Sequence, residues 1–153
     1  MESFVKNLRK AEEGLKKVER LIVLAQVSRN KNLMLIALEE IENVVKNCIS
    51  SILHYDYELK RVKIYKDSRM NFREFEVKSS RNLSLKQEEL HAIKEILEIA
   101  NEHRKSPMEF MKQKEVIILS EDQRMIKVSM EKLTHFVSIA QELLKRIKFK
   151  IKR

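Results

Sequence analysis

The chain has 153 residues, of which 43% are hydrophobic and 36% are charged, and its formal net charge is +9. This length suits one domain with a buried core, so we expect a single helical domain over residues 1–153. One glycine and one proline exclude the Gly-rich nucleotide-binding loops and predict few turns and long helices.

The compartment is indicated by three features of the sequence. The single cysteine, Cys48, excludes an internal disulfide and is typical of a reducing environment. The first residues, Met1 to Ser3, lack the basic and apolar layout of a signal peptide. The longest apolar runs, such as Leu21–Ala25, are too short to span a bilayer. We therefore expect a cytoplasmic protein without a membrane segment.

A long amphipathic helix is predicted at the start of the chain, because apolar residues recur every three or four positions from Phe4 to Ala25. Gly14 lies inside this pattern and marks a close approach or an exposed position rather than a break. Four further apolar residues widen the stripe toward its C-terminal end: Leu21, Val23, Leu24 and Val27. We therefore expect that end to be the more deeply buried.

A second helix follows the connector Ser28–Asn32, with an apolar stripe that extends from Met34 to Ile52. Because the connector is short, the two helices should be antiparallel neighbours. We expect Leu15 and Val45 in the core between them.

Residues 57–82 show a mixed pattern. Val62 and Tyr65 fit a helical spacing, whereas Phe75 and Val77 alternate as in a strand. We expect irregular helix in this segment.

Two motifs predict the starts of further helices. Ser84-Leu85-Lys86-Gln87 has the pattern of a capping box, in which the Ser and Gln side chains satisfy free amides. Ser106-Pro107-Met108-Glu109 repeats the pattern with proline at the first helical position, which predicts a short helix there.

A β-hairpin is predicted by two apolar stretches, residues 115–119 and 124–128, which flank the polar turn Ser120–Gln123. An isolated hairpin is marginally stable in water, so it should pack on the helices. Ser129 then caps a last amphipathic helix. The sequence thus predicts a mostly α-helical fold, a bundle of four to five helices with a small β-hairpin before the last helix.

Positive charge is concentrated in two stretches of the chain. Residues 57–82 hold eight basic and four acidic side chains, and residues 145–153 hold six basic and no acidic ones. Basic residues beside aromatics such as Tyr55 and Tyr57 can bind nucleic acid through phosphates and base stacking. The alternative is a solvated helix surface whose aromatics belong to the core. The candidate nucleic-acid-binding residues are Lys60, Arg61, Lys63, Lys66, Arg69, Arg73, Lys145, Arg146, Lys148, Lys150, Lys152 and Arg153.

The basic C-terminal end, residues 145–153, has two interpretations. A cationic tail attracts anionic polymers without specific contacts. In a structural tail, Ile147 and Ile151, four residues apart, would extend the apolar stripe of the last helix, and the lysines would complement its dipole.

We predict no metal and no cofactor. Glu88 and His91 form one Glu-x-x-His step, but di-iron sites in helical bundles need two such steps and two further glutamates. His103, followed by Arg104 and Lys105, ends a helix, where cationic residues complement the dipole.

The two N-terminal helices, with Leu8–Glu13 in the first and Ala37–Ile41 in the second, together with the basic surface resemble the HEPN superfamily of small helical bundles. Ribonucleases of that superfamily share an Arg-x4–6-His motif that supports metal-independent RNA cleavage. In this chain Arg29 and Arg81 are each followed by asparagine, but no histidine follows at that spacing. The resemblance therefore implies a non-catalytic member.

These observations favour a non-enzymatic binding module that engages RNA or another anionic partner through its basic surface. One alternative is a homodimeric interaction or scaffold protein that pairs through an apolar helix face. The other is a metal-independent ribonuclease whose residues meet only in the fold.

Overall fold

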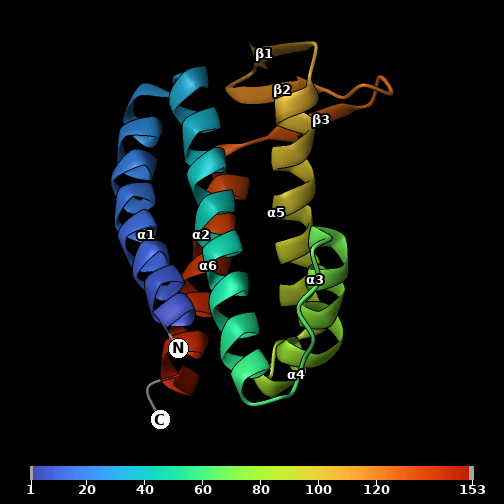
Figure 1. The fold of residues 1–153 in the computed structure, drawn as a ribbon. Helices are drawn as coiled ribbons and strands as arrows, with labels where there is room; N and C mark the ends of the chain where they lie inside the picture. Colours follow the sequence, from blue (N-terminus) through green and yellow to red (C-terminus); the bar gives the residue numbers. More distant parts are fainter. Residues whose placement is uncertain (1, 152–153) are drawn as a thin grey trace.

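The computed structural model describes residues 2–151 as a helical bundle with a small sheet at one end (Figure 1). This arrangement confirms the predicted fold class, with the sheet inserted before the last helix as expected. In chain order the elements are α1 (Glu2–Ser28), α2 (Lys31–Glu58), α3 (Ser68–Glu74), the π-helical turn η1 (Phe75–Ser79), α4 (Ser80–Asn82), α5 (Gln87–Lys105), β1 (Met108–Lys112), β2 (Glu115–Leu119), β3 (Met125–Val128) and α6 (Met130–Ile151).

The first two helices are long antiparallel neighbours, as predicted from the short connector (Figure 1). Arg29 turns the chain with a left-handed backbone, and the Asn30 side chain accepts hydrogen bonds from the amides of Asn32 and Leu33. Gly14 marks a close approach, because a Cβ atom at this position would lie 2.9 Å from Cγ2 of Val44. The helices can therefore meet closely at this point only because residue 14 has no side chain.

The expectation that the end of α1 is the more deeply buried was wrong. The core-facing stripe continues through Val18, Ile22 and Ala25, all of which are buried. Leu24 is 55% exposed and Val27 is 83% exposed, so these residues lie outside the core-facing stripe. Apolar composition in this turn therefore indicates an exposed apolar face rather than deeper burial.

The core lies where α1, α2, α5 and α6 meet, with α6 packed behind the first two helices (Figure 1). Val45 is fully buried, as predicted, whereas Leu15 is only partly buried against this core. Ser129 caps α6 as predicted, since its hydroxyl accepts the amide of Lys132 at 3.0 Å. Phe136 is the largest fully buried side chain of α6.

Residues 57–82 confirm the expectation of irregular helix. After α2 ends at Glu58, a loop leads to α3, which continues through η1 into α4. Asp67 caps α3 by accepting the amide of Arg69, and the buried Phe75 begins the π-helical turn. The turn inserts an extra residue into the helix, which explains why the apolar residues of this segment follow no single period.

The predicted capping box at Ser84 was wrong in its register. Ser84 adopts a left-handed backbone, and α5 begins at Gln87. Instead, the side chain of Glu89 reaches back and accepts the amide of Lys86 at 2.8 Å.

The predicted short helix at Ser106-Pro107 was also wrong, because residues 108–112 form strand β1. The strand pairs with β2 in an antiparallel register, with Phe110 opposite Ile117. Both turn residues between these strands, Gln113 and Lys114, have positive φ, which matches the twist of a two-residue hairpin. Pairing with β2, which lies further along the chain, overrides the local helix-start signal.

The predicted hairpin of β2 and β3 is confirmed, and β1 extends it to a three-stranded sheet of order β1-β2-β3. One face of the sheet packs on the helices through Val116, Ile118 and Val128. No helix within residues 2–151 is long and apolar enough to cross a membrane.

Candidate nucleic-acid interface

The six candidate residues of the first basic stretch are all exposed, but they do not share one surface. Lys60 and Arg61 directly follow α2 at the end of the bundle opposite the sheet (Figure 1). Lys63, Lys66, Arg69 and Arg73 lie along the loop and α3, which run back along the side of the bundle (Figure 1).

Arg61 has a structural role, because it pairs with the buried carboxylate of Asp56. A guanidinium nitrogen of Arg61 lies 3.5 Å from Oδ1 of Asp56, and the Ser79 hydroxyl donates to Oδ2 at 2.7 Å. Oδ1 accepts no hydrogen bond within the described part of the chain, so Arg61 supplies its counter-charge. The same contacts hold the π-helical turn η1 against the end of α2.

The C-terminal stretch also serves the fold through residue 151. Arg146 bonds both carboxylate oxygens of Glu89, at 3.0 and 3.1 Å, and the carbonyl of Ser84 at 2.8 Å. Lys148 pairs with Glu12 of α1 at 2.7 Å. Ile147 is buried and Ile151 packs against the core, so the structural interpretation of the tail holds for these residues.

The other cations of the C-terminal stretch differ. Lys145 is exposed and Lys150 is half-buried, and neither pairs with a carboxylate of residues 4–151. Lys152 and Arg153 lie outside the described residues.

Parts of both basic stretches lie at the same end of the bundle. Asp56 ties the end of α2 to Ser79, and the amide of Leu85 bonds the Ser80 carbonyl. The carbonyl of Ser84 then accepts Arg146 from the end of α6. We call this end of the bundle the basic end; the exposed cations on the elements that begin or end there are Lys60, Arg61, Arg81, Lys86 and Lys145.

Sequence reasoning did not count Arg81 and Lys86 among the candidate nucleic-acid-binding residues. Arg81 lies in α4, and Lys86 directly precedes α5, where the capping-box motif had marked it only as part of a helix start. Their charge was visible in the sequence, but their position beside the last helix follows from the bond between Arg146 and Ser84, which are 62 residues apart.

Two aromatic side chains are exposed near the basic end. Tyr57, in the last turn of α2, is 53% exposed, and Phe149, near the end of α6, is 71% exposed. Tyr55, the other tyrosine considered from the sequence, packs edge-to-face against Phe4 and belongs to the core. Exposed aromatic rings beside unpaired cations are the combination that single-stranded nucleic acids recognise.

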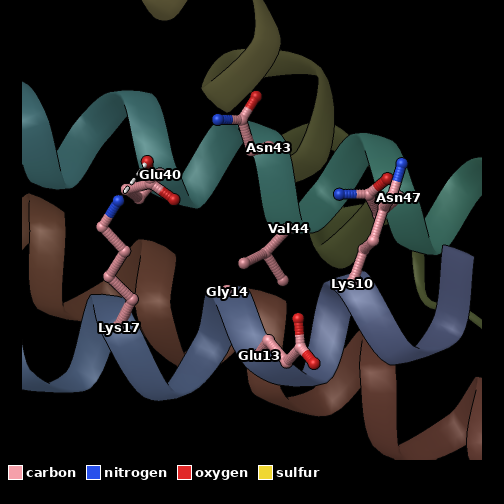
Figure 2. A pocket seen from close by; sticks show the side chains of 8 residues that line it. All are labelled: Lys10, Glu13, Gly14, Lys17, Glu40, Asn43, Val44 and Asn47. Atoms are coloured by element: carbon pink, nitrogen blue, oxygen red, sulfur yellow. Dashed lines mark hydrogen bonds and ion pairs between the residues drawn. The ribbon is translucent and has the colours of Figure 1, made fainter.

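A polar groove of about 290 Å³ follows the outer side of the crossing between α1 and α2 (Figure 2). Gly14 and Val44 form its floor, and Lys17 pairs with Glu40 across it at 3.3 Å. Because its rim carries two lysines and two glutamates, the groove has no net preference for anions. Its lining residues are Lys10, Glu13, Gly14, Lys17, Glu40, Asn43, Val44 and Asn47.

His103 lies between two carboxylates that come from other elements of the fold. Its Nδ1 is 2.5 Å from a carboxylate oxygen of Glu109 on β1, and its Nε2 is 2.7 Å from one of Glu39 on α2. The helix-dipole explanation of this histidine is therefore incomplete. The partners could not be found from sequence because Glu39 is 64 residues away.

The described residues contain no group of three or more His, Cys, Asp or Glu that could hold a metal ion. Glu88 and His91 are both exposed on α5. The absence of a bound metal therefore stays a prediction.

No arginine bonds a histidine within residues 2–151. His103 has both ring nitrogens occupied by carboxylates, and His54 bonds the carbonyl of Ser50 through Nδ1. The part of the chain that the structure describes thus supplies no assembled Arg–His pair for the ribonuclease alternative.

Comparisons with protein-family models, with curated proteins and with solved structures found no match to this chain. The resemblance to the HEPN superfamily therefore stays a prediction.

Proposed function

We propose that this protein is a non-enzymatic RNA-binding module that engages a single-stranded segment with the basic end. The observation that carries this proposal is that parts of both basic stretches lie at one end of the bundle, which is held together by the bonds of Asp56 with Ser79 and of Arg146 with Ser84. Cations that are scattered in the sequence therefore lie on elements that share one end of the bundle.

The charge balance of this surface supports the proposal. Its buried or partly buried carboxylates are already neutralised, Asp56 by Arg61 and Glu89 by Arg146. Lys60, Lys86 and Lys145 are exposed and pair with no carboxylate of residues 4–151. Exposed lysines without partners attract phosphates by releasing condensed counterions, without regard to base sequence.

The exposed rings of Tyr57 and Phe149 favour a single strand over a duplex. Bases of a single strand can stack on aromatic side chains, whereas paired bases are already stacked within the duplex. The proposed ligand is thus an unpaired RNA segment bound through phosphates and stacking.

The test measures binding of a fluorescently labelled oligouridine by anisotropy over a salt series. The variant Lys60→Gln, Lys86→Gln, Lys145→Gln should bind more weakly and flatten the slope of log affinity against log salt by up to about 2, at about 0.7 per phosphate contact. A matched control removes three exposed lysines from the sheet at the opposite end: Lys112→Gln, Lys114→Gln, Lys127→Gln.

Equal weakening by both variants would mean that only net charge matters, and it would overturn the proposal. Unchanged binding in the first variant would do the same. Selective binding to vesicles of anionic lipid, with no binding to oligouridine, would replace RNA with another anionic partner.

A further inference from the structure

A histidine sandwiched between two carboxylates joins three elements at the sheet end of the bundle. His103 lies in the last turn of α5, Glu39 lies in α2 and Glu109 lies in β1. The side chain of His103 is 12% exposed, so water has little access to the imidazole. We call these three residues the histidine bridge. It lies at the opposite end of the bundle from the basic end, so its chemistry is independent of RNA binding.

The chemistry of the histidine bridge requires a protonated imidazole. Ionised carboxylates only accept hydrogen bonds, and a neutral imidazole has one N–H to donate. Both contacts, at 2.5 and 2.7 Å, are hydrogen bonds only if Nδ1 and Nε2 both carry protons. Burial lowers the pKa of His103, but the hydrogen bonds and charges of Glu109 and Glu39 together outweigh burial, so that pKa is raised above its usual value.

Other charged groups surround the bridge and keep their own partners. On α5, Arg104 pairs at 2.5 Å with Glu42 of α2, which also pairs with Lys46 at 3.2 Å. At the start of α2, Lys31 donates to the backbone carbonyl of Glu109 at 3.3 Å. The Glu42 carboxylate raises the pKa of Arg104 further, so its guanidinium stays charged. Histidine is the group whose charge changes near neutral pH.

We propose that the histidine bridge is a pH-sensitive fastener that ties α2 to the unit formed by the end of α5 and strand β1. When His103 loses a proton, one of its nitrogens presents a lone pair to a carboxylate, and that contact opens. The side chain of Glu39 is 47% exposed and that of Glu109 is 17% exposed, so Glu39 can turn to water more readily. The remaining N–H therefore stays on Glu109.

The fastener loosens the sheet end without detaching it. His103 and Glu109 are six residues apart and remain joined, so the end of α5 and β1 still move together. The pairs of Arg104 with Glu42 and of Lys31 with the Glu109 carbonyl still link this unit to α2. Deprotonation thus removes one of three polar ties between them.

The sign of the pH effect follows from the raised pKa. The stabilisation is fully present below the unfolded pKa of histidine, about 6.5, and is lost as pH rises through the folded pKa of His103. Amide hydrogen exchange in β1, corrected for its intrinsic pH dependence, should therefore quicken across that titration.

Two measurements on the full chain test the fastener. Long-range proton–nitrogen NMR correlations should show His103 titrating above pH 6.5, from a doubly protonated ring to a neutral ring with its proton on Nδ1. Exchange in β1 should quicken with the same midpoint. A His103 that titrates at or below that value, or that keeps its proton on Nε2, would overturn the proposal.

Matched variants separate the fastener from general pH effects. The variant Glu39→Gln removes the carboxylate whose contact with His103 should open on deprotonation. It should therefore lower the titration midpoint of His103 and lower, by the same amount, the pH at which exchange in β1 quickens. The variant His91→Gln changes an exposed histidine of the same helix and should leave both unchanged. An exchange step that stays in place in Glu39→Gln while the midpoint of His103 moves would show that another group causes it.

Discussion

Arg146 and Glu89 form a two-pronged ion pair that joins the last helix to the start of α5, across 57 residues of sequence. Both side chains are mostly buried, and the same guanidinium bonds the Ser84 carbonyl. The fork of arginine suits this bidentate geometry, which a lysine cannot reproduce. Arg146 was expected to contact an anionic partner, but in the structure its guanidinium binds Glu89 and Ser84 and so links α6 to the start of α5.

The variant Arg146→Gln should therefore lose stability, by about 1–3 kcal/mol, because a partly buried carboxylate and a carbonyl lose their donors. Urea unfolding followed by circular dichroism measures this change. Lys145→Gln is the control, since it removes the same charge from the adjacent exposed residue and should change stability by less than about 0.5 kcal/mol. Equal effects of the two variants would contradict the structural role of Arg146.

Arg61 and Arg69 offer a second matched pair. Each lies 3.5 Å from an aspartate, but the Asp56 side chain is fully buried, whereas that of Asp67 is 42% exposed. Removing the partner of a buried carboxylate is far more damaging than breaking a surface pair. We expect Arg61→Gln to lower the free energy of unfolding by about 2 kcal/mol and Arg69→Gln by less than about 0.5 kcal/mol.

The same comparison bears on tests of RNA binding. A loss of binding in Arg61→Gln would mix instability with lost charge, whereas Lys60 carries no such structural partner. Measuring unfolding and oligouridine binding on Arg61→Gln and on Lys60→Gln separates these effects. If Arg61→Gln proves as stable as the unaltered chain, the buried pair is not what holds Asp56.

Local signals in the sequence were enough to predict much of the fold. The spacing of apolar residues predicted α1 and α2, and the turn Ser120–Gln123 predicted the hairpin of β2 and β3. The Ser129 cap also followed from its immediate neighbours. Each of these features depends on residues that are close in the chain.

The features that sequence reasoning missed depend on partners that are distant in the sequence. Such a partner can also override a local signal. Strand β1 exists because β2 is available to pair with it, although Pro107 favoured a helix start. Glu39 and His103 meet across 64 residues, and Arg146 reaches Ser84 across 62. Amphipathic spacing tells which face of a helix is buried, but not which charged side chains of two helices will meet.

The exposed apolar end of α1 gives a prediction that tests the corrected burial. Val18→Ala should cost about 1–2 kcal/mol because Val18 is fully buried, whereas Leu24→Ala should change the free energy of unfolding by less than about 0.5 kcal/mol. Urea melts of both variants measure the difference. A large loss in Leu24→Ala would show that this face is covered in solution, and sedimentation of the same variant would then test the alternative of a homodimer.

The close contact between Gly14 and Val44 predicts that the effect of Gly14→Ala on stability depends on the residue at position 44. Gly14→Ala adds about 1 kcal/mol of helix propensity, but its new Cβ would lie 2.9 Å from Cγ2 of the fully buried Val44. Because overpacking typically costs about 1–3 kcal/mol, we expect Gly14→Ala alone to be neutral or to lower stability by up to about 2 kcal/mol.

In a Val44→Ala background the clashing methyl group is absent, so the same Gly14→Ala change should raise stability by up to about 1 kcal/mol. The double-mutant cycle, measured by urea unfolding of the four proteins, isolates the interaction between the two sites. A stabilising Gly14→Ala in both backgrounds would mean that the helices can separate at this crossing without loss. The polar groove beside it (Figure 2) would then be a deformable surface rather than one fixed by the close approach of Gly14 to Val44.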